Sequence, residues 1–315
     1  MTTAPKGTKG RVSLSVILPC FNAVETIALQ LEALLRQPWP ADAELIVCDN
    51  GSTDGSMGVV ERYRSRLPHL RILDVYDGRG PRRGVARSYA LGFAAARGDV
   101  FLLCEADDVV GDEWLLPLTQ ALEKQELVAA ALDYDRLNAE HIRPKEWQQQ
   151  SRQEGLSTNS PPTFWPYASG CSLGLRRSVY ERLGDPDEQC AASWDTDFCW
   201  RAKQGGIALQ FVPEATLHYR MRTTPRAAFK QGKSWAQGHV ELDRKWAPAR
   251  SRLGMVKKEV RAMRDLAKQL RRGVDVVTGK QTFGGWLWGV GWCVGVVEAA
   301  PDNWRLAERV RAHGS

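Results

Sequence analysis

The chain has 315 residues, 43% hydrophobic and 25% charged, which is the composition of a globular protein with one large domain and an extension, or with two domains. Its seven cysteines are scattered without a CxxC pair, which argues against a zinc site and against a secreted disulfide framework. The net charge of +6 is uneven: residues 1–220 carry 24 basic and 29 acidic side chains, and residues 221–315 carry 19 and 8. A basic tail on an acidic body predicts an anionic partner for the tail, such as a membrane, phosphate or nucleic acid.

Strand and helix patterns alternate through the first half of the chain. Short runs rich in apolar residues predict strands at 14–18, 44–48, 70–73 and 100–104, and the last run is continuously apolar, which is typical of a strand covered on both faces. Apolar residues at helical spacing fill the intervals and predict helices at 24–36, around 59–67 and at 84–96. This alternation predicts an α/β fold with a doubly wound, mostly parallel sheet and right-handed crossovers.

The second half is less regular. We expect a helix near 113–123 and a strand near 127–132. The polar stretch 136–163 follows, and we expect it to form a long surface loop over the ligand site that is predicted below. They are followed by a further strand and a short helix, then by a helix that begins at Trp194, and finally by a last strand at 207–212. We therefore predict a disordered leader, an α/β domain and a helical extension, at residues 1–11, 12–220 and 221–315 respectively.

Three carboxylates follow the fourth predicted strand directly: Glu105, Asp107 and Asp108. Open α/β sheets bind their ligands at the carboxyl ends of the strands. Carboxylates this close together repel one another unless a positive charge lies among them, and hard divalent cations prefer oxygen ligands. The run therefore predicts a metal site at the strand end, with a solvated acidic turn as the alternative.

Five motifs together resemble the inverting family 2 glycosyltransferases, which have the GT-A fold. In chain order they are SVILPCFNAVETI, IVCDNGSTDGS, GVARSYALGFAAARGDVFLLCEADD, WDTDFCWRAKQGG and HYR. The resemblance covers about residues 13–220. It implies an enzyme that moves a sugar from a nucleotide-diphosphate sugar to an acceptor hydroxyl. A non-catalytic nucleotide-sugar binder or scaffold with the same fold is the alternative, supported by two departures from the family pattern, at Glu105 and Trp194.

The resemblance implies that the donor nucleotide lies at the first two strand ends. Pro19 and Asn22 match the first-strand motif, and Asp49 matches the carboxylate that accepts a hydrogen bond from the base. A carboxylate there can accept from the ring N–H of uracil or thymine, which favours UDP- or dTDP-sugars. Turn formation is the alternative for Asp49. Arg87 matches a contact to base or phosphate, and Arg220 a clamp on the diphosphate.

The same resemblance implies a metal site. Glu105, Ala106 and Asp107 stand at the family's Asp-x-Asp signature, so that Asp107 would bind Mg²⁺ or Mn²⁺ and Glu105 would lie nearer the ribose or a metal-bound water. His218 matches a further metal ligand, with a packed histidine as the alternative. The cation would neutralise charge on the diphosphate leaving group. Glu105 is one methylene longer than the usual Asp.

Asp195 matches the family's general base, which takes the proton of the attacking hydroxyl. Helix capping is the alternative role. Trp194 replaces the usual Glu, and a large aromatic residue there predicts stacking against a sugar or an apolar acceptor. Gly170 lies in the small-residue acceptor segment, and Trp165 is a candidate platform. The acceptor classes left open are glycans, lipid-linked saccharides and small molecules.

The tail holds two unusual segments. Residues 255–272 predict a basic amphipathic helix, and residues 283–297 are apolar and rich in Trp and Gly, but shorter than the ~20 residues that span a bilayer. Trp favours membrane interfaces, so these segments predict either attachment to an anionic membrane or packing on the body or on a second subunit. No nucleic-acid motif is present, and we do not expect a nucleic-acid partner. Without a secretory h-region we expect a cytoplasmic protein, either free or peripheral on the inner membrane face.

Overall fold

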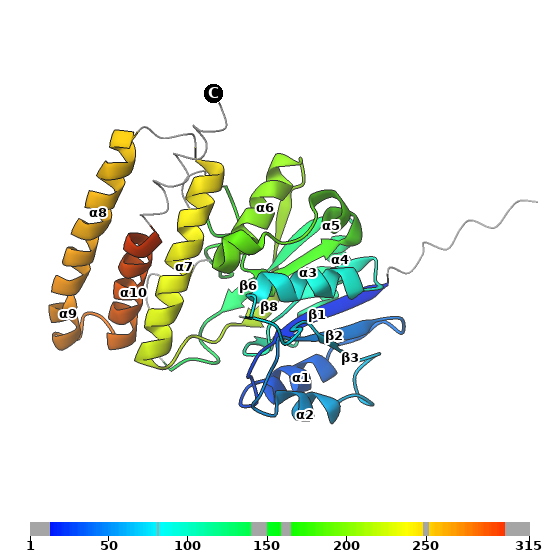
Figure 1. Cartoon of the computed structure of the whole chain (residues 1–315). Helices are drawn as coiled ribbons and strands as arrows, with labels where there is room; N and C mark the ends of the chain where they lie inside the picture. Colours follow the sequence, from blue (N-terminus) through cyan, green and yellow to red (C-terminus); the bar gives the residue numbers. More distant parts are fainter. Residues whose placement is uncertain (1–12, 81, 140–149, 159–164, 248–251, 300–315) are drawn as a thin grey trace, which may run out of the picture.

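The computed structural model describes residues 13–80, 82–139, 150–158, 165–247 and 252–299 (Figure 1). The predicted leader at 1–11 and much of the predicted loop at 136–163 lie outside these residues. Within the described part, the centre of the molecule is an eight-stranded sheet in the order β3-β2-β1-β4-β7-β6-β8-β5. The sheet is mixed and mostly parallel, which confirms the predicted fold class.

The first half of the chain forms the parallel part of the sheet. Its strands are β1 (Leu14–Cys20), β2 (Glu44–Asp49), β3 (Arg71–Asp74) and β4 (Val100–Leu103). They are connected by α1 (Ile27–Leu35), α2 (Ser56–Glu61) and α3 (Val85–Ala95). Every residue of β4 is buried, as its continuous apolar run predicted, and every residue of β1 is buried as well, because helices cover both faces of these strands.

The second half adds the antiparallel pairs. Its strands are β5 (Val109–Val110), β6 (Leu127–Asp133), β7 (Leu173–Arg176) and β8 (Leu209–His218). The prediction missed β5 and ended the last strand at 212, just before Pro213. The β6 register opposite β8 shifts between Ala130 and Ala131, and such an irregularity accommodates a proline inside a strand. The longer β8 brings residues 220–222 to the acidic run that follows β4.

Helices cover the sheet in two layers. One layer consists of α1, α2 and α4 (Leu115–Leu122), and the other of α3, α5 (Arg177–Leu183) and α6 (Trp194–Gln204). The short helices η2 (Gly170–Ser172) and η3 (Glu188–Ser193) precede β7 and α6. All seven cysteines are free and all but Cys293 are buried, as expected for core thiols.

The C-terminal helices are α7 (Pro225–Trp246), α8 (Arg252–Arg271), α9 (Gly273–Val277) and α10 (Phe283–Ala299). Figure 1 shows α7 next to the sheet and α8 farthest from it. Glycines bring α7 and α10 into close contact: a Cβ on Gly232 would lie 2.2 Å from the Trp288 carbonyl oxygen, and a Cβ on Gly291 2.2 Å from that of Phe229. Gly291 and Gly295 of the Trp-rich segment therefore serve the packing of α10 on α7.

Among the described residues, none of the helices combines the length and the apolar character needed to cross a bilayer.

Candidate active site

A cleft of about 920 Å³ opens at the carboxyl ends of β1 and β4. The ends of parallel strands meet at one edge of the sheet, so the loops that follow them surround a common space. The lining comes from the segments 19–26, 82–85, 105–107 and 220–224, with additional single residues. Five predicted site residues are brought together there: Pro19, Asn22, Glu105, Asp107 and Arg220.

The acidic cluster consists of Glu105, Asp107 and Asp108, with one ligand oxygen of each within 4.8 Å of the others. Burial raises the pKa of Glu105 to about 8 and that of Asp108 well above its usual range. The negative charge of the nearby Asp107 carboxylate is the second largest cause of both shifts. The buried Oδ2 of Asp108 has no hydrogen-bond partner among the described residues. An all-oxygen donor set with an orphaned buried oxygen fits a hard divalent cation such as Mg²⁺ or Mn²⁺.

Two arginines from the segment after β8 contact this cluster. The Arg220 backbone N–H donates to Asp108 Oδ1 at 2.8 Å, and its Nε–H donates to the Asp107 carbonyl at 2.7 Å. The Arg222 guanidinium pairs with Asp107 Oδ2 at 2.6 Å. Arg222 was not singled out from the sequence, although the sequence shows this second arginine two residues after Arg220. The cluster therefore already has one cationic partner, and the buried Nη2 of Arg220 lacks a hydrogen-bond partner among the described residues.

His218 does not join the acidic cluster. Its Nδ1 pairs with Asp133 Oδ2, and its Nε2 lies 3.0 Å from Arg136 Nη1. The ring is not among the residues that line the cleft. Neither group of closely spaced ligands in the described part of the chain includes His218, and its metal role stays a prediction.

At the part of the cleft where the resemblance predicts the nucleotide, Asn22 keeps the loop after β1 in place. Its φ is 48° and its Oδ1 accepts from the Thr53 N–H at 2.8 Å. Asp49 ends β2 and accepts from the Ser52 N–H at 2.9 Å, which is the turn contact that the alternative expected. Asp49 does not line the cleft, whereas the neighbouring Asn50 does. Contact of Asp49 with a base stays a prediction.

Arg87 also lies away from the lining, within 3.7 Å of Glu188. The basic residues that do line the cleft here are Arg82 and Arg83, which sequence reasoning missed although they lie in the basic DGRGPRRG loop. The Arg82 guanidinium lies 4.5 Å from the Phe21 ring centroid and donates to the Asn50 carbonyl at 3.1 Å. A nucleotide contact by Arg87 stays a prediction.

Asp195 lies in the first turn of α6. Its Oδ2 accepts from the Gly170 N–H at 2.8 Å, and its Oδ1 accepts from the Thr196 N–H at 2.7 Å. Burial raises the pKa of Asp195 to about 6 although these hydrogen bonds oppose it. Its charge also raises the pKa of Glu105, so the two carboxyls lie close enough to interact. A carboxylate with a pKa near neutral pH suits a general base.

The structure corrects the acceptor role predicted for Trp194. Its side chain belongs to the core, with 2% exposure, and its ring lies 4.8 Å from that of Tyr89. A buried indole offers no face for stacking to an acceptor. A Cβ on Gly170 would lie 2.3 Å from this ring, so Trp194 packs against the segment that orients Asp195.

Trp165 packs edge-on to Trp246, with ring centroids 6.1 Å apart, and its carbonyl accepts from Trp200 Nε1. It does not line the cleft. The predicted acceptor contacts of Trp165 and Gly170 stay predictions.

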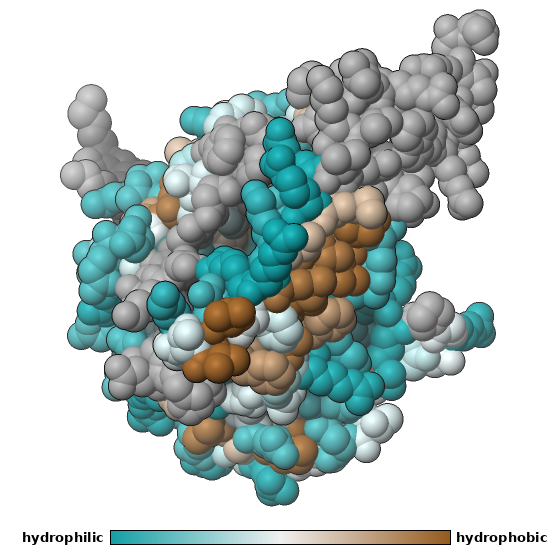
Figure 2. Space-filling model, turned by 90° about the vertical axis from the view of Figure 1, so that its left-hand side faces the viewer, coloured by the Kyte–Doolittle hydropathy of each residue, from teal (hydrophilic) through white to brown (hydrophobic). Residues whose placement is uncertain are grey.

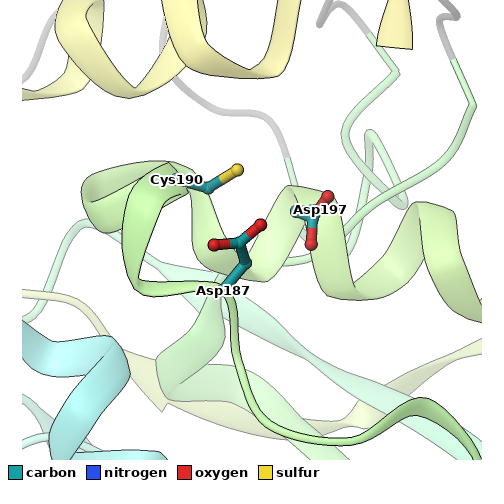
Figure 3. A group of neighbouring side chains, drawn as sticks. All are labelled: Asp187, Cys190 and Asp197. Atoms are coloured by element: carbon teal, nitrogen blue, oxygen red, sulfur yellow. The ribbon is translucent and has the colours of Figure 1, made fainter. Parts of the chain in front are cut away.

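A second cluster contains Asp187, Cys190 and Asp197, at the start of α6 and just before it (Figure 3). Lys245 of α7 already lies among these side chains, 2.7 Å from Asp187 Oδ2 and 2.8 Å from Asp197 Oδ1. Burial raises the pKa of the Cys190 thiol to about 12, and a protonated thiol is a poor metal ligand. We interpret this cluster as an ion-pair network that attaches α7 to α6.

Comparisons with solved structures agree with the fold. The mannosyltransferase PcManGT from Pyrobaculum calidifontis in complex with GDP-Man and Mn²⁺ is 17% identical, with a TM-score of 0.55 over 96% of this chain and 81% of that one. GalNAc-T7 with UDP, GalNAc and Mn²⁺ is 16% identical, with a TM-score of 0.56 over 82% of this chain and 51% of that one. At such low identity these similarities show the GT-A-like fold alone.

Sequence comparisons cover part of the chain. The "Probable glycosyltransferase YdaM" of Bacillus subtilis (strain 168) is 25% identical over 241 residues, which are 72% of this chain and 55% of that protein. The chain thus spans only about half the length of this curated relative. The model of glycosyl transferase family 2 matches residues 15–184, which are more than half of the chain and include every segment that lines the cleft before residue 220. This match and the fold together show that the chain belongs to glycosyl transferase family 2.

Proposed function

We propose that the protein is a metal-dependent, inverting glycosyltransferase that uses a nucleotide-diphosphate sugar, of the UDP or dTDP type. The α/β domain at 12–220 would hold the donor and the metal, and the extension at 221–315 would complete the cleft from one side. The observation that carries the proposal is the joint placement of the Glu105–Asp108 acidic cluster and the arginines 220 and 222 at the cleft. This pairing of oxygen ligands with guanidinium groups suits a diphosphate bound with a cation.

In this proposal Asp107 is the principal metal ligand, with Glu105 and Asp108 beside it. When bound, Mg²⁺ or Mn²⁺ would supply Lewis-acid stabilisation of the diphosphate leaving group. Arg220 and Arg222 would bind phosphate oxygens, because planar guanidinium groups match them geometrically. Pro19 and Asn22 would hold the nucleotide against the loop after β1.

Asp195 would act as the general base. The acceptor oxygen attacks the anomeric carbon from the face opposite the diphosphate, its proton passes to the Asp195 carboxylate, and the bond from carbon to diphosphate oxygen breaks. This single displacement inverts the anomeric configuration. The Gly170 and Thr196 N–H groups orient the carboxylate, and its raised pKa suits it to take a proton near neutral pH. The acceptor is a glycan, a lipid-linked saccharide or a small molecule.

Two variants test the proposal. Nucleotide sugars are first screened with Mn²⁺ for thermal stabilisation, since a ligand at 100 times its Kd adds about 2.7 kcal/mol. With the donor identified, Asp195→Asn should lower transfer about 10²- to 10⁴-fold and keep the Mn²⁺–nucleotide stabilisation. Asp107→Asn should lose the Mn²⁺-dependent stabilisation.

The matched control is Asp112→Asn, at an aspartate whose side chain is 74% exposed. It should change neither readout. Full transfer by Asp195→Asn would refute the base assignment. Donor binding by the wild type without any transfer or donor hydrolysis would favour the non-catalytic binder instead.

A further inference from the structure

The tip formed by the end of α8, α9 and the start of α10 exposes apolar side chains. Leu270 is 51% exposed, Val274 67%, Val277 88% and Phe283 51%. Figure 2, which looks onto the side of the C-terminal helices, shows apolar residues gathered in a band with hydrophilic residues around it. Exposed apolar residues that adjoin one another, rather than being scattered singly, are typical of interaction sites.

The surroundings of this tip are basic. Residues 263–283 contain five basic side chains and two acidic ones, an excess of three positive charges. The two acids lie near basic residues of the same segment: Asp265 is 3.9 Å from Lys268, and Asp275 is 3.5 Å from Arg272. Arg271 and Lys280 are exposed on either side of α9 in the sequence.

We propose that the α8–α10 tip, residues 263–283, binds the surface of an anionic lipid bilayer. Apolar side chains enter the boundary between headgroups and acyl chains, and each nearby Lys or Arg adds about 1 kcal/mol of attraction to an anionic leaflet. A second copy of this chain would bring the same excess of positive charge to the contact, and like charges repel. Charge complementarity therefore selects an anionic surface over self-association.

The tip lies at the same end of the helices as the rim of the cleft. Thr223, Thr224 and Ala227 line the cleft, and they lead into the first turn of α7. The next turns of α7 pack along α10, with Gly232 against Trp288, so Phe283 at the start of α10 lies toward the start of α7. Figure 1 shows α9 and the beginnings of α7 and α10 at one end. Contact through the tip would bring the cleft rim near the lipid, which, if the proposed function holds, favours a lipid-linked acceptor.

Vesicle flotation tests the proposal with the full chain and does not depend on activity. The wild type should float with phosphatidylcholine vesicles that contain phosphatidylglycerol, much less with phosphatidylcholine alone, and less as salt rises. The double variant Val274→Glu/Val277→Glu should reduce the bound fraction about tenfold, and Arg271→Glu/Lys280→Glu should also reduce it. The substituted side chains are exposed, so both variants should keep the wild-type Tm and the Mn²⁺–nucleotide stabilisation.

Control substitutions of the same kind, apolar to Glu and basic to Glu, lie on α4 and just after it. Leu116→Glu replaces an apolar side chain that is 48% exposed, and Lys124→Glu an exposed lysine, and both should float like the wild type. Absence of wild-type flotation with anionic vesicles at low salt, or equal flotation of the tip variants, would overturn the proposal. If the wild type does not float and sedimentation shows a dimer that Val274→Glu/Val277→Glu converts to a monomer, the proposal would also be overturned.

Discussion

The Nη1 of Arg222 lies 2.6 Å from Oδ2 of Asp107, so a side-chain cation pairs with the carboxylate that we propose as the metal ligand. The two residues are 115 positions apart in the sequence and meet because β8 ends beside the loop after β4. Arg222 therefore counters part of the charge of the acidic cluster without a metal. A bound divalent cation would compete for Asp107, and the freed guanidinium could bind the donor's diphosphate.

Replacing Arg222 by Met should make Mn²⁺ alone bind more tightly. The pair is partly exposed, so the competition that is lost is about 1 kcal/mol, or about fivefold in affinity. Affinity for the Mn²⁺–nucleotide pair should fall, because a diphosphate contact is lost. Calorimetric titration measures both binding constants. The control is Arg62→Met, at an exposed arginine that directly follows α2. Weaker binding of Mn²⁺ alone would contradict this account of Arg222.

The pH dependence of catalysis should show the raised pKa of Asp195. With a pKa of about 6, this carboxyl is protonated in acid and cannot accept the acceptor's proton. We expect kcat/KM to fall about tenfold per pH unit below about pH 6 and to be level just above it. Initial rates at saturating metal across pH 4.5–8 measure the profile. An acidic limb with a midpoint near 4 would contradict the raised pKa of Asp195.

The metal-free protein should lose stability as the pH rises through the titration of Glu105. The folded pKa of this carboxyl, about 8, lies above its ordinary value of 4.5, so the folded state binds the proton more tightly than the unfolded state. The contribution of the Glu105 carboxyl to the free energy of unfolding is fully present below about pH 4.5 and is lost by about pH 8. Glu105→Gln should therefore gain stability relative to the wild type between pH 5 and 9.

Urea unfolding in EDTA at several pH values measures this difference. Glu113→Gln, at an exposed position, should follow the wild type at every pH. A constant difference between Glu105→Gln and the wild type would mean that Glu105 titrates at its ordinary pKa.

Gly170→Ala should impair transfer while sparing donor binding. A Cβ there would lie 2.3 Å from the Trp194 ring, so the ring or the backbone must move, and the Gly170 N–H moves away from Asp195. We expect a loss of about 1–3 kcal/mol of stability from overpacking, and a lower kcat with unchanged nucleotide stabilisation. Gly58→Ala is the control, since a Cβ there meets nothing within 4 Å. Wild-type kcat in Gly170→Ala would remove the proposed orienting role.

Lys245→Met should loosen the junction of α6 and α7. It leaves Asp197, which is fully buried, without one of its cations, although Arg201 still pairs with it at 2.9 Å. Because one partner remains, we expect a loss of about 2 kcal/mol, below the range for removing the sole partner of a buried charge. Lys233→Met breaks the more exposed pair with Glu298 and should cost under about 1 kcal/mol.

Chemical denaturation measures both lysine variants. Equal losses would show that the buried network contributes no more than a surface pair. Stabilisation of the wild type by Zn²⁺ that Cys190→Ser abolishes would instead identify the network as a metal site.

Much of the fold could be predicted because its signals are local. The fully apolar run at Val100–Leu103 predicts a strand covered on both faces, and repeated strand–helix spacing predicts a parallel sheet. Since parallel strands end at one edge, the polar residues after β1 and β4 had to lie near one another. The carboxylates Glu105 and Asp107 follow from this rule, whereas the family resemblance marked Pro19 and Asn22, and all four line the cleft.

Other features depend on contacts that no local pattern carries. Residue type alone marked Trp194 as an acceptor platform, but its rotation on α6 directs the ring into the core against Tyr89. The prediction ended the last strand at 212 and did not reveal Arg222. In the structure, the shift in register opposite Pro213 lets β8 continue to His218, and this extension decides which side chains reach Asp107.

The sequence by itself determined the layered α/β architecture and the edge of the sheet where the carboxylates gather, because periodicity and strand direction set both. Only the tertiary structure decided which charges are paired there. It placed Arg222, and not His218, on the acidic cluster, and it directed Gly291 and Gly295 of α10 toward α7 while leaving Val277 exposed. The physical reason is that burial and pairing depend on side-chain direction and on contacts between distant segments, which spacing along the chain does not encode.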